Sequence, residues 1–323
     1  MKDLSTDHVM VNTADKCPAC NSEQRSSLGI KNSCPIYQCL SCRSLYSERV
    51  ALDYDDYYDE SNLTVPDFIQ GQLDKVFESL KKYRRTNRVL DIGCGAGSVL
   101  EAAKRAGWDG EGLEISVPAV EYVRSLGFKV FQGDLASAPY PDDYFDVVIA
   151  SELLEHVTDP LSLLKQVARI LRPGGVLWAT TPNGRGVSSR MLGVSWTTVC
   201  PPEHLQLFSI NGLRQLIEKA GFERIRMQAR GCNPFEILHA LRSRNRQTKS
   251  NGSQENAAGP AEAPAALNEE SFDRVSSSYQ LNEALLRNSL TRSVKSAANA
   301  ALGLTGLGDS IRIQAEKREG ISE

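Results

Sequence analysis

Residues 89–97 constrain the fold of this chain more than any other stretch. They read Val-Leu-Asp-Ile-Gly-Cys-Gly-Ala-Gly, an apolar run that leads into a turn with three closely spaced glycines. A helix-forming sequence follows at residues 99–105 and ends at Gly107. A strand that passes through a glycine turn into a helix is typical of doubly wound sheets, which bind ligands at the carboxyl ends of their strands. Because glycine has no Cβ, a ligand can lie directly against the backbone of such a turn.

Strand-like and helix-like patterns alternate along the middle of the chain. Residues 145–150 (Phe-Asp-Val-Val-Ile-Ala) are apolar enough for a central strand that is covered on both faces. Residues 161–171 carry apolar side chains at helical spacing, and Pro173-Gly174-Gly175 should stop that helix. This alternation predicts an α/β fold, a doubly wound parallel sheet with helices on both faces. The other predicted elements are strands at residues 88–92, 111–115, 129–132, 176–180 and 224–229, and helices at residues 118–125 and 211–220.

A further strand is predicted near the end of the chain. Residues 310–315 (Ser-Ile-Arg-Ile-Gln-Ala) alternate polar and apolar side chains, and we expect them to return to the main sheet. Residues 232–308 would then be an insertion before the last strand. Within it, residues 243–272 contain almost no large apolar side chains, which predicts a disordered linker.

Composition argues against several classes of protein. With 323 residues, 41% of them hydrophobic, the chain can form one large domain with smaller additions. A formal charge of −3 and a pI of about 5.9 give no basic field for a nucleic-acid backbone, so no nucleic-acid partner is expected. No apolar run approaches the roughly 20 residues of a membrane helix, and the polar N-terminus lacks a signal-peptide stretch. We therefore expect a cytoplasmic protein.

Acidic residues follow two successive predicted strands. Glu114 lies near the end of the second strand, where a carboxylate can accept hydrogen bonds from both hydroxyls of a ribose. Asp134 follows the third strand and could bind an adenine amino group while Leu135 packs on the ring. Each acid could instead be a solvated loop carboxylate. Together, at neighbouring strand ends, they indicate a site for an adenosine.

The spacing of the glycines separates two kinds of adenosine cofactor. A dinucleotide turn would read Gly-x-Gly-x-x-Gly, but here the third glycine falls one position early, at Gly97. The pattern resembles motif I of the class I S-adenosylmethionine-dependent methyltransferases, and the resemblance extends through Glu114, Asp134, residues 145–157 and residues 171–175.

This resemblance covers roughly residues 85–230. It implies a seven-stranded Rossmann-like sheet, with an antiparallel last strand beside the fifth, and S-adenosyl-L-methionine as cofactor. The positions that would contact the cofactor are Asp91, Gly93, Cys94, Gly95, Gly97, Glu114, Asp134, Leu135 and Ser151. Cys94 is expected to serve there as a small residue and not as a nucleophile.

Two histidines are candidates for proton transfer from the acceptor. An enzyme of this kind holds the acceptor in line with an activated methyl group and can remove a proton from it. His204 lies in the loop after the fifth strand, and its pKa would suit a general base, or it could order that loop through a hydrogen bond. His156 follows the fourth strand and could face the reaction centre or cap the next helix. A lid over the cofactor could include Tyr54, Tyr57 and Tyr58, or these could pack in an ordinary way.

The loop after the fifth strand indicates the kind of acceptor. Trp196, residues 201–205 (Pro-Pro-Glu-His-Leu) and residues 307–311 look like a branch that contains ubiquinone-type O-methyltransferases and sugar methyltransferases of bacterial surface-glycan pathways. The resemblance implies a hydroxyl oxygen on a small molecule or glycan intermediate.

Three alternatives remain open at this point. One is N- or C-methylation of a sugar or other metabolite, and another is a non-catalytic cofactor-binding scaffold that recruits a partner. A nucleic-acid methyltransferase is disfavoured by the acidic pI and by Ser151-Glu152-Leu153-Leu154, which stands in place of an Asn/Asp-Pro-Pro-Tyr/Phe motif.

Two Cys-x-x-Cys pairs stand near the N-terminus. Cys17 and Cys20 form the first pair, and Cys39 and Cys42 form the second. In a reducing cytosol such clusters are better explained as metal ligands than as disulfides, and the spacing fits a four-cysteine zinc ribbon. Because sulfur would fill all four positions, the zinc would be structural, although related modules in sugar methyltransferases also contribute to substrate binding. A redox dithiol or unconnected thiols are the alternatives, and Cys34 is not expected to be a ligand.

Residues 281–302 predict an amphipathic helix. Apolar side chains recur at helical spacing from Leu281 to Ala301, with basic residues among them. The helix could pack on the core or across a homodimer, or make a peripheral contact with a membrane surface. The expected organisation is a flexible tail at residues 1–16, a zinc-ribbon-like module at 17–50, a methyltransferase core at 51–231, the insertion at 232–308, and the final strand with a tail at 309–323.

Overall fold

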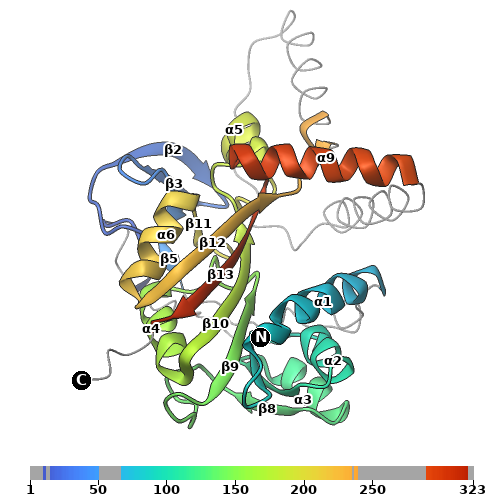
Figure 1. Ribbon diagram of the computed structural model, residues 1–323. Helices are drawn as coiled ribbons and strands as arrows, with labels where there is room; N and C mark the ends of the chain where they lie inside the picture. The colour runs from blue at the N-terminus through green and yellow to red at the C-terminus, as the bar shows by residue number, and fades with distance from the viewer. Residues whose placement is uncertain (1–9, 12–14, 51–66, 235, 239–288, 319–323) are drawn as a thin grey trace, which may run out of the picture.

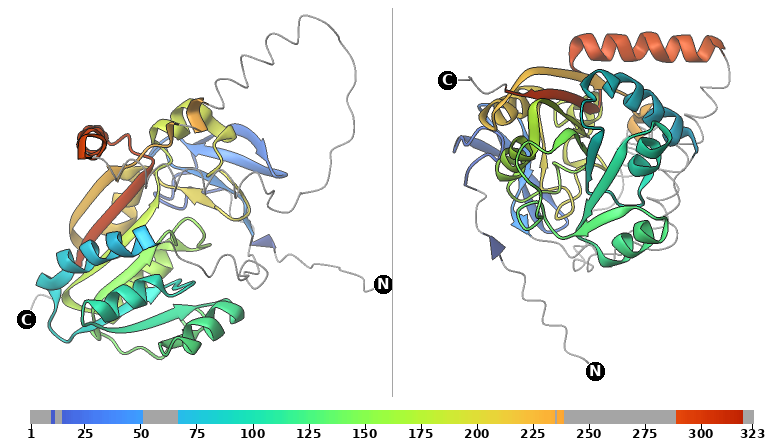
Figure 2. Two further views of the ribbon diagram at one scale, coloured as in Figure 1. Left: turned by 90° about the vertical axis from the view of Figure 1, so that its right-hand side faces the viewer. Right: turned by 60° about the horizontal axis from the view of Figure 1, so that its bottom comes forward.

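The computed structural model describes residues 10–11, 15–50, 67–234, 236–238 and 289–318 (Figures 1 and 2). Two features expected from the sequence, the disordered linker and the three tyrosines of a lid, lie outside the described residues. The described chain forms a large sheet with helices on both faces, and a smaller sheet against one end of it (Figure 1).

The large sheet has seven strands in the order β12-β13-β10-β9-β6-β7-β8. Strands β8, β7, β6, β9 and β10 are parallel, whereas β13 pairs antiparallel with both β10 and β12. The predicted Rossmann-like sheet, with its antiparallel last strand beside the fifth, is therefore confirmed. The bounds are β6 (Arg88–Ile92), β7 (Asp109–Glu114), β8 (Lys129–Gln132), β9 (Phe145–Ser151), β10 (Leu171–Pro182), β12 (Phe222–Arg230) and β13 (Ser310–Lys317).

Helices cover the two faces of this sheet because successive side chains of each strand point to opposite sides. On one face, Val89, Val147 and Val176 pack with α1 and α2. On the other face, Leu90, Val148 and Leu177 belong to the core under α4 and α6. In Figure 1, α1 and α2 lie to the right of the sheet and α4 and α6 to its left. The helices are α1 (Asp67–Leu80), η2 (Lys81–Tyr83), α2 (Ser98–Arg105), α3 (Val117–Ser125), α4 (Pro160–Ile170), α5 (Val187–Leu192), η3 (Gly193–Ser195), α6 (Ile210–Lys219) and α9 (Ser289–Thr305).

The Pro173-Gly174-Gly175 segment does not separate a helix from a later strand. Helix α4 ends at Ile170, and β10 begins at once with Leu171, which pairs with Phe145. The Pro-Gly-Gly residues form an irregularity inside β10, since the register with β9 shifts between Leu171 and Val176. Proline cannot donate to a strand ladder, so such a bulge is the place where a sheet tolerates it.

Helix α9 agrees with the predicted amphipathic helix over part of its length, and residues 281–288 lie outside the described residues. Its C-terminal end contacts β12, where Asn299 Oδ1 accepts a hydrogen bond from Gly231 N at 3.0 Å. Two positions of the predicted apolar stripe, Ala298 and Ala301, are exposed. Among the described side chains, the contact with the core is therefore made by the C-terminal end of the helix and not by Ala298 or Ala301.

The cysteine-containing segment forms a small antiparallel sheet in the order β11-β4-β3-β2. Its strands are β2 (Arg25–Lys31), β3 (Cys34–Cys39), β4 (Leu45–Ser47) and β11 (Gln206–Leu207), and a separate two-stranded pair joins β1 (Met10–Val11) to β5 (Arg49–Val50). Strand β11 comes from the loop before α6, so the expected zinc-ribbon-like module and the core share a sheet. The predicted division of the chain at residue 50 stays a prediction.

A buried ion pair fixes the start of β6. The Asp146 carboxylate is fully buried; one oxygen accepts from Arg172 Nε at 2.6 Å, and the other accepts from the backbone N–H groups of Arg85, Thr86 and Asn87. Burial alone would raise the pKa of Asp146, but these hydrogen bonds outweigh it and hold the pKa below its ordinary value.

We predict that Asp146→Asn lowers the free energy of unfolding by about 3 kcal/mol, because Arg172 loses its buried partner. Because the pKa of Asp146 is lowered in the folded state, its contribution is present above the unfolded pKa of about 4 and is lost as pH falls below it. Urea unfolding at pH 7 and at pH 3 measures both effects, and the difference between variant and wild type should shrink at pH 3.

Asp142→Asn is the matched control for this prediction. Asp142 is 71% exposed and pairs with Arg169 on the surface, so its loss should cost below about 1 kcal/mol. Equal effects of the two substitutions would contradict the role given to Asp146.

Candidate active site

The glycine turn between β6 and α2 is built from backbone that only glycine adopts easily. Gly93, Gly95 and Gly97 have φ angles of 70°, 46° and 78°. Gly97 N donates to Cys94 O at 2.8 Å, which closes the turn. A Cβ on Gly93 would approach the Leu153 side chain at 3.0 Å, so the backbone also needs the space. The turn therefore presents bare backbone beside the first helical turn of α2.

The Glu114 carboxylate holds this turn in place. It is 4% exposed, and its Oε2 accepts from Gly95 N at 3.0 Å. Its Oε1 accepts from Ile115 N at 2.8 Å and from Ser116 N at 3.1 Å. A carboxylate offers about four lone-pair positions and three are used here, so Oε2 can still accept from a ligand hydroxyl.

Asp91 is a buried acid near the C-terminal end of β6. Its side chain is 2% exposed, and no hydrogen-bond partner of its carboxyl group is found among the described residues. Burial, followed by the nearby Glu114 charge, raises the pKa of Asp91 well above its ordinary value. An isolated buried carboxylate is costly, and a cation bound beside it would offset that cost.

Asp134 and Leu135 follow β8, next to the end of β7. Gly133 N donates to Glu114 O at 2.9 Å, so Asp134 lies close to Glu114. Asp134 is exposed, and its Oδ1 accepts from Ser137 N at 2.8 Å, while Leu135 is buried in the core. Hydrogen bonding by Ser137 lowers the pKa of Asp134, which keeps it ionised.

The ends of β9 and β10 add two hydroxyl groups to this edge of the sheet. Ser151 Oγ and Thr180 Oγ1 lie 3.0 Å apart, and Glu152 N donates to Thr180 O at 2.9 Å. Ser151 lies on the same face of the sheet as Asp91, since Asp91 pairs with Ile149. Cys94, by contrast, lies in an apolar cluster with Leu100, and burial raises the pKa of its thiol.

His156 and His204 lie against each other, with ring centroids 4.7 Å apart. His156 Nδ1 lies 3.0 Å from Glu203 O, and His204 Nδ1 lies 2.7 Å from Thr198 O. Since a carbonyl oxygen can only accept, both Nδ1 atoms carry the proton, and Nε2 is the basic nitrogen of each neutral ring. Burial, followed by His204, lowers the pKa of His156 to about 4, so His156 is neutral at pH 7.

Glu155 joins this histidine pair. Its side chain is fully buried, and its Oε2 accepts from Thr181 Oγ1 at 2.9 Å. Its Oε1 lies 4.0 Å from His156 Nε2, and the ligand-type atoms of Glu155, His156 and His204 all lie within 4.8 Å of one another. Such a set can pass a proton, and it can equally bind a divalent cation.

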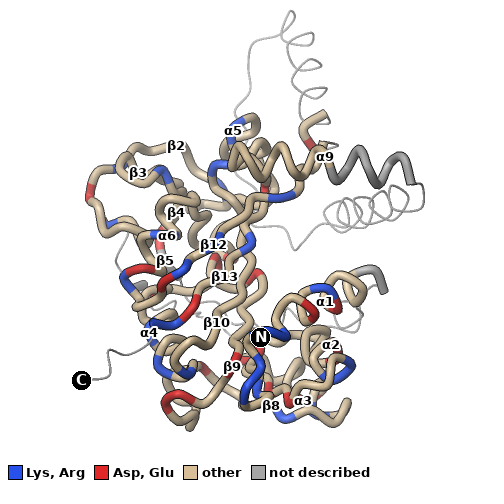
Figure 3. The backbone as a smooth tube through the Cα atoms, viewed as in Figure 1, with Lys and Arg blue, Asp and Glu red and all other residues tan. Residues whose placement is uncertain are grey.

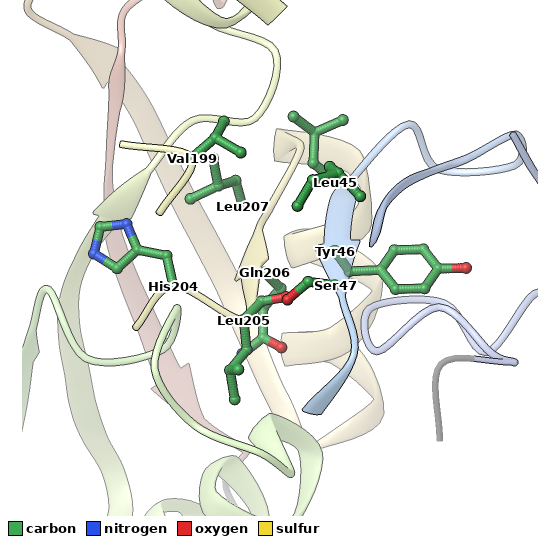
Figure 4. A pocket seen from close by; sticks show the side chains of 9 residues that line it. Leu45, Tyr46, Ser47, Val199, His204, Leu205, Gln206 and Leu207 are labelled. Carbon is green, nitrogen blue, oxygen red and sulfur yellow. The ribbon is translucent and has the colours of Figure 1, made fainter. Parts of the chain in front are cut away.

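The loop that carries His204 is held by the cysteine-containing sheet. Lys31 Nζ donates to Trp196 O at 2.7 Å, and Asn32 Nδ2 donates to Pro201 O at 2.9 Å. A small pocket forms where the two parts meet, lined by Ile36, Leu45, Tyr46, Ser47, Val199, His204, Leu205, Gln206 and Leu207. Figure 4 shows His204 at one side of this pocket and the Tyr46 ring pointing away at the other.

The four predicted cysteines converge on one point. Their Sγ atoms all lie within 4.8 Å of one another, with Cys17 and Cys42 at 3.5 Å and Cys20 and Cys39 also at 3.5 Å. A tetrahedral zinc with bonds of about 2.3 Å needs sulfur atoms that close together. The hydrogen bond from Cys17 lowers the pKa of Cys42 to about 5, which favours the thiolate. The cluster therefore suggests a zinc site.

The N-terminal end of α6 lies directly against this cysteine cluster. Ser209 caps the helix by accepting from Gly212 N at 2.9 Å, and its hydroxyl donates to Cys42 O. A Cβ on Gly212 would lie 2.9 Å from Cys42 Sγ, so only glycine fits at this position. The cluster is part of the same hydrophobic core as Leu213 and Leu216.

The structure groups the residues that the sequence singled out into three neighbouring sets. Gly95 and Glu114 are joined by a hydrogen bond and form the first set, His156 and His204 form the second, and the cysteines form the third. The structure does not support His156 as the cap of the next helix, because the Asp159 side chain caps α4 by accepting a hydrogen bond from Ser162 N. Sequence reasoning missed Glu155 and Thr180, although Glu155 stands next to His156.

Comparison with known proteins agrees with the fold of the large sheet and its helices. A family model described as a methyltransferase domain matches residues 65–226. A ubiquinone biosynthesis O-methyltransferase of Thiobacillus denitrificans is 35% identical over 169 residues, which are 48% of this chain and 72% of the relative. The corresponding enzyme of Cereibacter sphaeroides is 28% identical over 65% of this chain and 83% of its own length.

Among solved structures, phosphoethanolamine N-methyltransferase 2 of Haemonchus contortus, in complex with S-adenosyl-L-methionine, has the same fold. The TM-score is 0.50 at 17% sequence identity, covering 85% of this chain and 63% of that chain. At this identity the likeness concerns the fold alone.

The seven-stranded sheet with its glycine turn and strand-end acids defines a class I S-adenosylmethionine-dependent methyltransferase. With the match over residues 65–226, this chain belongs to the methyltransferase domain family. S-adenosyl-L-methionine is the cofactor that the family implies, and such an enzyme acts on a small acceptor substrate. Among the helices that the structure describes, none combines the length and apolar character needed to cross a membrane.

Proposed function

We propose that this methyltransferase acts on a hydroxyl oxygen of a small molecule or glycan intermediate. The observation that carries the proposal is the pair of histidines, His156 and His204, at the carboxyl edge of the sheet, with each Nδ1 beside a backbone carbonyl oxygen. A hydroxyl group must lose a proton when it is methylated, and an imidazole Nε2 can take that proton near neutral pH. The similarity to O-methyltransferases of ubiquinone biosynthesis supports the same choice.

The cofactor would lie over the glycine turn at the ends of β6, β7 and β8. Bare backbone at Gly93, Gly95 and Gly97 lets it approach, and Glu114 Oε2 would accept from a ribose hydroxyl. The unpartnered, buried Asp91 carboxylate suits the cationic end of the cofactor. Asp134 and Leu135 would hold the adenine, with Ser151 and the backbone at Cys94 completing the set.

When bound, S-adenosyl-L-methionine supplies a methyl group that is already activated on a sulfonium. The residues of this chain would then orient the acceptor oxygen in line with that methyl group. His204 would accept the hydroxyl proton at Nε2, while the Thr198 carbonyl holds its Nδ1–H and hence the ring orientation. His156 and the buried Glu155 support the ring from the other side.

We also propose that the cysteine cluster binds one structural zinc ion. Thiolates would fill all four positions, which leaves no site for substrate on the metal. Because Ser209 and Gly212 of α6 contact the cluster, and because β4 pairs with β11, zinc would stabilise the loop that carries His204.

The cofactor site is tested by calorimetric binding of S-adenosylmethionine and S-adenosylhomocysteine. Wild type should bind both, and Glu114→Gln should weaken binding about tenfold or more, because charged hydrogen bonds to the ribose are lost. Glu111→Gln, on the same strand but away from the turn, is the matched control and should bind as wild type does. Absence of binding to folded wild type would overturn the proposed function.

The base is tested by His204→Gln and His204→Ala, assayed for transfer of a labelled methyl group to a panel of phenols, sugars and amines. Glutamine can still donate a hydrogen bond to Thr198 O, but it has no basic nitrogen. Both variants should lower kcat about 100-fold or more on a hydroxyl acceptor. A normal kcat for His204→Gln would show that the ring only orders its loop, and transfer confined to amines would contradict oxygen as the acceptor atom.

The metal is tested by assaying zinc in the purified protein and in two cysteine variants. Wild type should hold about one zinc ion per chain, and Cys17→Ser should lose most of it. Cys34→Ser should keep its zinc, because Cys34 lies on β3 outside the cluster. A zinc-free wild type, or equal loss in both variants, would rule out the site.

A further inference from the structure

Two arginines lie side by side on one face of the sheet, and none of the described residues forms an ion pair with either of them. Arg312 of β13 and Arg230 of β12 are diagonal neighbours, since Arg230 pairs with Ser310 and Gln228 pairs with Arg312. Both side chains are half-buried, and the Nε atom of each is buried without a hydrogen-bond partner. The ion pairs of the described arginines involve Arg25, Arg105, Arg169, Arg172 and Arg224, but neither Arg230 nor Arg312.

This arrangement is unfavourable for the protein alone. Burial, followed by the neighbouring Arg230, lowers the pKa of Arg312 to about 10, although the Trp178 ring lies 5.7 Å from its guanidinium carbon and favours its charge. Two guanidinium groups that repel each other and lack an acceptor gain stability when an anion binds between them. The planar fork of a guanidinium matches the oxygens of a phosphate group.

The arginines lie in a row of side chains that leads toward the proposed cofactor site. Across the strands, Arg312 is opposite Thr180, which is paired with Ser151, and all three side chains are on one face. Asp91 lies on the same face one strand further along. In Figure 1 this is the side of the sheet on which α1 lies, with α9 crossing its upper end, and Figure 3 shows basic residues along β12 and β13.

Strand spacing gives the distance between the two ends of this row. Neighbouring strands lie about 4.8 Å apart, so the backbone at Arg312 lies about 10 Å from Ser151. Asp91 is one strand further away and is displaced along the strand because it pairs with Ile149, so it lies about 16 Å from Arg312. Within the described part of the chain, a buried acid without a hydrogen-bond partner thus lies at the cofactor end, and two basic groups without ion-pair partners lie at the other end. One small molecule that reaches from Ser151 to Arg312 can carry the accepting hydroxyl at one end and an anionic group at the other.

We propose that Arg230 and Arg312 bind a phosphate group of the methyl acceptor, which makes the substrate a phosphorylated hydroxyl compound. The proposal rests on the proposed function, because the row is assigned to the acceptor through its proximity to the cofactor site. Two guanidinium groups match the two negative charges of a phosphate monoester better than the single charge of a carboxylate.

Inorganic phosphate is the probe for this site, followed through the thermal unfolding of the full chain at constant ionic strength. Wild type should show a saturable rise in Tm with phosphate, and acetate should produce none. In Arg312→Gln and in Arg230→Gln the midpoint of the titration should move to about tenfold higher phosphate. Arg226→Gln removes the same charge from β12 further along the strand, near Tyr83, and should change the midpoint less than about twofold.

The absence of a saturable response in wild type would overturn the proposal, as would an equal response to acetate or an equal loss in Arg226→Gln. Calorimetric binding of S-adenosylhomocysteine is measured on the same proteins and should be unchanged in all three variants, which also shows that they fold. Failure of that binding in wild type contradicts the proposed function, whereas a failed phosphate titration with normal cofactor binding contradicts only the role of the two arginines.

Discussion

Both ends of the candidate site depend on strands whose side chains alternate between two different environments. Strand β13 buries Ile311, Ile313 and Ala315 completely on the face covered by α4 and α6. A slip of one residue would bring Arg312 into that apolar core, so hydrophobic burial fixes the register. The register in turn aligns Arg312 with Thr180 and Ser151 on the opposite face. The polar row is therefore a consequence of apolar packing on the other side of the sheet.

The cysteine cluster is connected to the same architecture through the segment that precedes α6. Strand β11 pairs with β4, and the next residues, Phe208 and Ser209, pack into the core and cap α6. Gln206 Nε2 donates to Leu154 O and Val157 O, which joins this segment to the loop after β9. A short stretch thus contacts the cysteine cluster, the histidine pair and the end of the sheet. For this reason, loss of the proposed zinc ion should disturb the position of His204.

Much of the fold could be predicted, because it depends on local signals. The glycine turn at Gly93–Gly97, the apolar run of β9 and the alternation of β13 each specify an element through periodicity or backbone freedom. The Cys-x-x-Cys pairs likewise specify a common site through their spacing. The prediction that the Pro-Gly-Gly segment separates a helix from a strand was wrong, because a sequence that usually stops an element can also form a bulge within a strand.

The sequence by itself determined the class of fold, the glycine turn and the cysteine cluster, since each follows from residues close together in the chain or from a regular pattern. Only the tertiary structure decided that Glu155 joins the two histidines, that the cysteine module shares a sheet with the core, and that Arg230 and Arg312 lie side by side with no ion-pair partner among the described residues. These relations join residues that are far apart in the chain. They depend on sheet register and on which polar groups remain unpaired after packing, and neither leaves a local signal in the sequence.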